Sequence, residues 1–187
     1  MNVYPIEAGN FKLDGGAMFG VVPKSLWTKT NPADADNMIE MSSRCMLVEN
    51  NDKLILVDTG MGDKQSEKFF KYYKRWGSDN LVKSINSAGF SIDDVTDVLL
   101  THLHFDHCGG AVAWDSSKEA FDVLFKNANY WSNEKHWDWA TSPNPREKAS
   151  FLDENLFPIK ESGQLKFINN MSKDFNYCEE LGLEILC

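Results

Sequence analysis

The sequence predicts a layered α/β or α+β domain in which helices cover a β-sheet. Segments with strand-like and helix-like patterns alternate along all 187 residues, without a repeat, a low-complexity stretch or a linker between them. Hydrophobic residues make up 42% of the chain and aromatic residues 12%, which is enough to build a real core. We therefore interpret residues 1–187 as a single domain.

The first half of the chain supplies a hairpin followed by two helices. Residues 3–13 are expected to form a short strand, a turn and a second short strand, and the glycine-rich segment 14–20 an irregular loop. Residues 38–49 and 53–58 are expected to pair as a hairpin around the turn at 50–52. Four consecutive apolar residues in the second of these strands predict burial on both of its faces. Helices are expected over 65–76 and 80–88, and a buried strand over 95–100.

The second half continues the alternation. Ser132 is the expected N-cap of one helix, and Pro145 the expected first residue of another. Strands are expected at 121–125, 129–131, 165–168 and 181–187.

Composition and charge exclude several classes of function. The net charge of -9 argues against nucleic acid as a partner, because phosphate binding needs clustered Lys and Arg. We find no apolar stretch long enough for a membrane span and no basic, apolar leader at the N-terminus. The four cysteines form no CxxC pair, which suits reduced thiols. These features predict a cytoplasmic protein without a nucleic-acid or membrane partner.

The segment from Thr101 to Gly110 contains three of the four histidines. His102 and His104 lie two residues apart, so on an extended chain they point to the same side and can bind one cation. Asp106 and His107 follow where the chain must turn, with Gly109 and Gly110 expected to permit the bend. Four such ligands predict two adjacent divalent metals, for which zinc, manganese and iron are all suitable. A chance surface cluster is the alternative, and the buried strand before the motif argues against it.

Two adjacent metals favour hydrolysis. Ions roughly 3.5–4 Å apart can share a bridging hydroxide, and water bound to zinc loses its proton near pH ~7. That hydroxide can attack an ester, lactone, amide or phosphoester. Asp106 is the candidate catalytic residue, since it can hold a metal and later pass a proton to the leaving group.

Other residues are weaker candidates. Asp58 ends a buried strand, where it can either cap a turn or orient a metal-bound histidine. Met18 and Phe19 can form an apolar wall of a substrate pocket, or a loop tucked under a sheet. His136 is interpreted as a packed or surface residue rather than a ligand, and Cys108 as a small buried residue rather than a soft ligand.

The pattern His102-x-His104-x-Asp106-His107, preceded by Val57-Asp58-Thr59-Gly60, resembles the signature of the metallo-β-lactamase-fold hydrolases. Residues 11–24 further resemble the branch of quorum-quenching N-acyl-homoserine-lactone lactonases. The resemblance implies an αββα sandwich with two zinc ions at one edge. It places His102 and His104 on the first metal, Asp106 and His107 on the second, and Asp58 behind them. A lactone or another small ester is the implied substrate.

The chain departs from this family pattern in its C-terminal half. The family supplies a third histidine, a bridging aspartate and a final histidine there, whereas this chain has only His136 after His107. The resemblance therefore implies a C-terminally truncated member with an incomplete metal site and an exposed sheet edge, which leaves homo-oligomer formation open. Two alternatives to a hydrolase stay open: an iron-dependent redox relative, and a non-catalytic metal-binding or interaction fragment.

Overall fold

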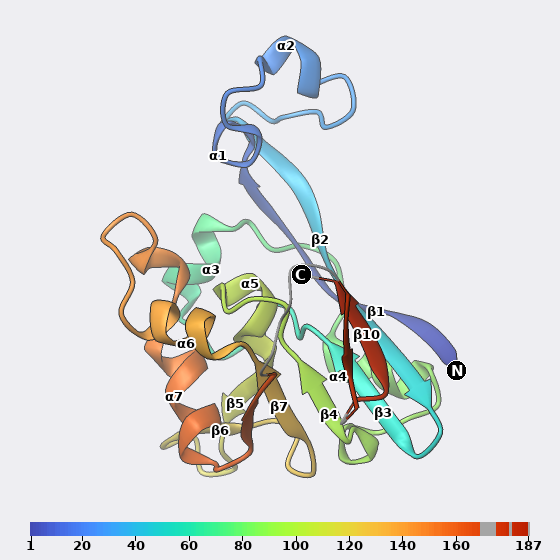
Figure 1. Cartoon of the computed structure of the whole chain (residues 1–187). Helices are drawn as coiled ribbons and strands as arrows, with labels where there is room; N and C mark the ends of the chain where they lie inside the picture. Colours follow the sequence, from blue (N-terminus) through green and yellow to red (C-terminus); the bar gives the residue numbers. More distant parts are fainter. Residues whose placement is uncertain (169–174, 180, 187) are drawn as a thin grey trace.

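A six-stranded mixed sheet forms the centre of the computed structural model, which describes residues 1–168, 175–179 and 181–186 (Figure 1). The strand order is β1-β2-β3-β4-β7-β8. The first three strands are antiparallel, and β3, β4, β7 and β8 run parallel to one another. Their bounds are Asn2–Asp14 (β1), Met38–Asn50 (β2), Lys53–Val57 (β3), Asp97–Leu99 (β4), Asn129–Ser132 (β7) and Leu165–Phe167 (β8). The carboxyl ends of four adjacent strands therefore meet at one edge.

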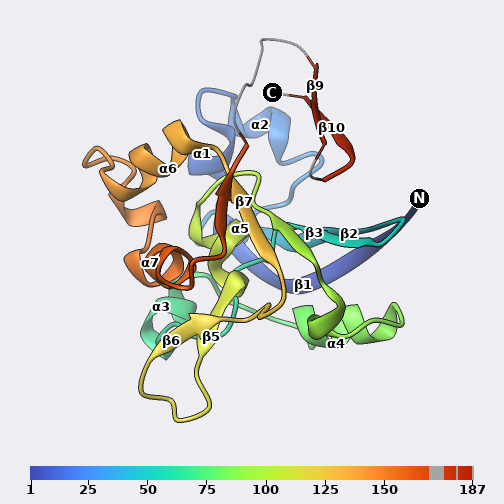
Figure 2. The same ribbon diagram turned by 60° about the horizontal axis from the view of Figure 1, so that its bottom comes forward.

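Helices and two small hairpins surround this sheet (Figure 2). The helices are α1 (Gly15–Phe19), α2 (Lys24–Trp27), α3 (Glu67–Tyr72), α4 (Leu81–Ser87), α5 (Phe105–Cys108), α6 (Glu134–Thr141) and α7 (Asp153–Glu161), with single 3-10 turns at Ile92–Asp94, Gly109–Ala111 and Lys148–Ser150. The hairpins pair β5 (Val112–Trp114) with β6 (Phe121–Val123), and β9 (Phe175–Cys178) with β10 (Leu183–Leu186). Within the described ranges, none of these helices is both long and apolar enough to cross a membrane.

Both faces of β3 are buried, as predicted for the strand 53–58. Leu54 and Leu56 of β3 point into the larger core, which also contains side chains from α4, α6 and α7. Ile55 points the other way, into a second core that includes Cys178 and Leu181 of the β9–β10 hairpin. The strand period of two thus separates a helical layer from a β layer on opposite faces of the sheet.

The N-terminal segment differs from its prediction. Residues 2–14 form one strand rather than two, because both ends pair with β2 and only the register shifts between Glu7 and Asn10. Gly9 accommodates this bulge with a φ of 128°. The segment predicted to be an irregular loop forms α1, whose first turn is capped by Asp14 accepting the Ala17 N–H at 2.8 Å.

Four further predictions need correction. Helix α3 is shorter than 65–76 because Lys74 takes a φ of 42°, and Tyr72 and Trp76 at the end of the expected helix are 67% and 46% exposed. Asn133, not Ser132, caps α6. The segment after Pro145 forms turns before the 3-10 turn at 148–150, and α7 starts only at Asp153. The last predicted strand begins at Leu183 rather than Leu181, and Cys187 lies outside the described residues.

Candidate metal centre

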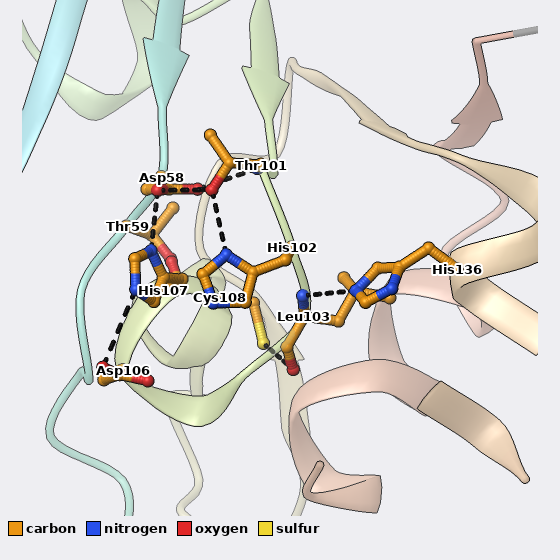
Figure 3. A network of polar contacts seen from close by, with 9 residues as sticks. All are labelled: Asp58, Thr59, Thr101, His102, Leu103, Asp106, His107, Cys108 and His136. Atoms are coloured by element: carbon orange, nitrogen blue, oxygen red, sulfur yellow. Dashed lines mark hydrogen bonds and ion pairs between the residues drawn. The ribbon is translucent and has the colours of Figure 1, made fainter. Parts of the chain in front are cut away.

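The candidate site lies where three neighbouring parallel strands end (Figure 3). Asp58 directly follows β3, and the segment from Thr101 to His104 follows β4. His136 lies in the first turn of α6, which follows β7. The carboxyl ends of parallel strands are the usual place for ligands in open α/β sheets. The topology therefore brings together residues from segments that are far apart in the sequence.

Side chains alternate along the motif itself. Leu103 and Phe105 are buried in the core, whereas His102, His104 and Asp106 are only half-buried. The ring centroids of His102 and His107 lie 3.9 Å apart, and those of His102 and His104 lie 4.7 Å apart. Asp106 Oδ2 is 3.7 Å from His107 Nε2. The structure thus gathers the four side chains that the sequence analysis assigned as ligands.

The loop after β3 is bonded directly to the helix α5 that carries His107. The Thr59 N–H and hydroxyl both donate to the His107 carbonyl, at 2.8 and 3.0 Å. The Gly110 N–H donates to the Gly60 carbonyl at 2.9 Å. A Cβ at Gly110 would lie 2.2 Å from the Thr59 carbonyl oxygen, and one at Gly109 would lie 2.2 Å from that of Met61. Close approach of two backbones therefore requires both glycines.

This finding corrects the expected role of the glycine pair. Gly109 has a φ of -60° and a ψ of -38°, which any residue can adopt. The bend after His107 does not need a glycine at that position.

Asp58 joins the two loops through its carboxylate. It accepts the Thr101 N–H at 2.9 Å, the Thr101 hydroxyl at 2.8 Å and His107 Nδ1–H at 2.8 Å. The bond to Nδ1 leaves His107 Nε2 as the nitrogen that faces Asp106. Burial lowers the pKa of His107, but the hydrogen bond to Asp58 and the charges of Asp106 and Asp58 outweigh it, so the net shift is upward. Asp58 therefore contacts the histidine it was expected to orient, and its role in orienting a metal-bound histidine stays a prediction.

His102 is neutral at physiological pH. Burial, followed by the nearby His107 and His104, lowers its pKa to about 4. Its Nδ1 lies 3.2 Å from the Thr101 hydroxyl. A neutral imidazole is the form that binds metals.

The kind of donor present fits a divalent cation. Three imidazoles and one carboxylate match the ligands preferred by zinc, manganese and iron(II). Among the described residues, however, no group of three or more His, Cys, Asp or Glu side chains is arranged so that it could hold a metal ion. The side chains are thus suitable in type and lie close together, but they do not form a complete coordination set.

The remaining candidates take other positions. Cys108 is fully buried, its thiol donates to the Leu103 carbonyl at 3.3 Å, and burial raises its pKa to about 12, so it stays a thiol. Met18 and Phe19 lie on α1, at the end of an arm formed by β1 and β2 (Figure 1). Phe19 stacks on Trp27 with centroids 5.0 Å apart, and Met18 is 45% exposed.

A hollow of about 130 Å³ borders Asp58, Asp106 and His107. Met18 and Phe19 do not line this hollow. Its other walls come from β1, β2 and the loop after β3, through Phe11, Met41, Ser42, Ser43, Arg44, Cys45 and Gly60. No local sequence signal points to these residues, because only the pairing of β1 with β2 places their side chains beside the motif.

His136 is in contact with the motif, although the sequence analysis set it aside. Its Nε2 accepts the N–H of Leu103 at 3.0 Å. The interpretation that it is a packed residue and not a ligand agrees with this engagement of Nε2. The contact itself joins residues 33 positions apart, and no local sequence signal points to it.

Comparison with known proteins identifies relatives for most of this structure. The family model described as the metallo-beta-lactamase superfamily matches residues 39–165. An N-acyl homoserine lactonase of Bacillus cereus is 28% identical over 104 residues, which are 50% of this chain and 40% of that protein. A probable metallo-hydrolase of Mycobacterium tuberculosis is 31% identical over 108 residues, covering 50% of this chain and 35% of that protein. The chain thus matches less than half the length of these relatives.

Solved structures extend the likeness over nearly the whole chain. A probable metal-dependent hydrolase from Staphylococcus aureus superposes with a TM-score of 0.81 at 28% identity, covering 94% of this chain and 60% of that one. A dizinc quorum-quenching lactonase, solved with a product of its reaction, gives a TM-score of 0.65 at 25% identity, covering 97% of this chain and 65% of that one.

Proposed function

Because the chain belongs to the metallo-beta-lactamase superfamily, we propose that it carries the histidine motif of a metal-dependent hydrolase whose substrate is a lactone or another small ester. The observation that carries the proposal is the bond from His107 Nδ1 to Asp58. This bond keeps the proton on Nδ1 and leaves the opposite ring nitrogen, which faces Asp106, free to bind a cation.

Each residue has a role in this proposal. His102 and His104 bind one divalent cation, and Asp106 and His107 bind a second. Zinc is favoured, because the lactonase neighbour is described as a dizinc enzyme. A bound zinc would supply Lewis acidity and lower the pKa of water. Asp106 passes a proton to the leaving group, and Asp58 keeps His107 in the correct tautomer.

The hollow beside His107 suits a small ester. Phe11 and Met41 give it an apolar side, and Ser42 and Ser43 give it polar atoms. Small-molecule sites usually combine apolar walls with a few polar groups in this way. The match to lactonases from Bacillus supports a lactone as the first substrate to test.

A non-catalytic metal-binding or interaction domain is the second candidate. The observation that favours an interaction domain is that no described group of three or more side chains is arranged to hold an ion. Turnover decides between the two candidates, because an interaction domain would not hydrolyse lactones.

The ligand assignment is tested by zinc titration of the wild type and of His102→Ala. We expect the variant to lose zinc, and Asp52→Ala, a change in the exposed β2–β3 turn, to retain it. Unchanged zinc content in His102→Ala would refute the assignment.

Assays with lactones and phosphotriesters, each in the presence of zinc and of iron, test the reaction. Oxygen consumption with iron would indicate the redox alternative.

A further inference from the structure

Leu103 is the residue on which the His102–His104 segment is anchored. Its side chain is fully buried in the larger core. Its N–H donates to His136 Nε2 at 3.0 Å, and its carbonyl accepts the Cys108 thiol at 3.3 Å (Figure 3). The segment 102–104 belongs to no helix or strand. Side chains from other segments therefore satisfy both polar groups of this residue.

His136 is itself held in place. The backbone N–H of His136 donates to Asn133 Oδ1, at the start of α6, at 3.2 Å. Its ring contacts Phe151, at 5.8 Å between centroids. Phe151 also contacts the ring of His104, at 4.9 Å. One buried aromatic side chain thus packs against both His136 and His104.

We propose that His136 is a positioning residue: by accepting the Leu103 N–H, it fixes the directions in which His102 and His104 project. Leu103 lies between the two histidines, so any rotation of its peptide would turn them away from each other. An acceptor is needed there because an unpaired buried N–H is costly. A hydrogen bond at Nε2 also requires the proton on Nδ1, so the contact specifies the tautomer of His136.

This inference concerns the backbone of the motif, and it rests on the proposed function only in expecting that the two histidines bind zinc. Its first test therefore uses the protein without metal. In a ¹⁵N-labelled sample, we expect a scalar coupling across the hydrogen bond between the Leu103 amide nitrogen and His136 Nε2. Imidazole ¹⁵N shifts should show the Nδ1–H tautomer. An Nε2–H tautomer without this coupling would overturn the proposal.

Two substitutions of His136 then separate the effect of its hydrogen-bond acceptor from the effect of its ring packing. His136→Gln places an amide oxygen near the position of Nε2, whereas His136→Phe keeps a ring but has no acceptor. We expect hydrogen exchange of the Leu103 amide to accelerate about 10-fold or more in His136→Phe and to stay near the wild-type rate in His136→Gln. Asp138→Asn, an exposed change on the same helix, is the matched control.

Zinc affinity, measured by competition with a chromophoric chelator, gives the second readout. We expect it to fall about 10–100-fold in His136→Phe and to be restored by His136→Gln. Equal affinity in His136→Phe and the wild type would overturn the positioning role. A wild type that binds no zinc would instead defeat the proposed function, and the coupling and exchange data would still decide the inference. If His136→Phe fails to fold, the wild-type spectra and His136→Gln decide it.

Discussion

Replacing Asp58 by asparagine tests how the two loops of the site depend on one carboxylate. Asp58 has a φ of 59°, in the left-handed region that aspartate and asparagine tolerate better than other residues with a side chain. The substitution Asp58→Asn therefore keeps the backbone and removes the charge. The new amide oxygen could still accept the Thr101 N–H and hydroxyl, but the amide NH₂ group would meet His107 Nδ1–H. That histidine would then change tautomer or lose its partner.

The expected magnitude follows from these contacts. A hydrogen bond to a charged group contributes roughly 1.5–3 kcal/mol, and the change weakens the bonds to Thr101 and His107 together. We expect the free energy of unfolding to fall by about 2–4 kcal/mol, measured by urea denaturation without metal. A change of tautomer would put the proton on Nε2, the nitrogen proposed to bind zinc. Zinc affinity should therefore also fall, by about 10–100-fold.

Asp52→Asn is the matched control, because it removes one carboxylate from the exposed β2–β3 turn without touching the site. It should change neither quantity measurably. The reasoning would be refuted if Asp58→Asn had the same stability and the same zinc affinity as this control. Lost stability with unchanged zinc affinity would show that Asp58 joins the loops without orienting His107.

Two further predictions concern the packing around helix α5. Gly110→Ala should lower the free energy of unfolding by about 2 kcal/mol or more, because its Cβ would lie 2.2 Å from the Thr59 carbonyl oxygen. In the same urea denaturation, Gly16→Ala on the exposed helix α1 should lower it far less. Equal losses of stability in the two variants would contradict the close-approach argument. Lys64 is buried, its Nζ donates to the Gly109 carbonyl at 2.5 Å, and burial lowers its pKa to about 8 from 10.5. The unfolded chain therefore binds more protons between pH 8 and 10.5, so stability should rise with pH across that window, by at most about 3 kcal/mol. Lys64→Met should abolish this rise, and an identical pH profile in the variant would disprove it.

Local patterns were sufficient to predict the elements that position the site. The apolar run of β3, the short strand β4 and the spacing of the histidines are all readable within a few residues of sequence. The family match over residues 39–165 confirms the superfamily that two short motifs indicated. The four assigned ligands also lie together in the structure, although their role as ligands stays a prediction.

Long-range contacts explain what the sequence could not reveal. Residues 3–13 were expected to form two strands, yet pairing with β2 on both sides of the bulge keeps residues 2–14 in one strand. Gly109 and Gly110 were expected to serve a bend, whereas the backbone of residues 59–61 is what excludes a larger side chain. In both cases, the deciding partner lies far away in the sequence.

The spacing of the histidine motif can now be given a second physical reason. In H-x-H, the alternation that places both histidines on one side also places the intervening residue on the other, and here that residue is the fully buried Leu103. The contacts that hold the motif use the backbone of Leu103, the carboxylate of Asp58 and Nδ1 of His107. None of them occupies His107 Nε2, which the proposed function needs for an ion. A small side chain at position 103 would keep all four ligands and the backbone contacts of residue 103, and would still loosen the site, because the buried side chain that anchors the segment to the core would be lost.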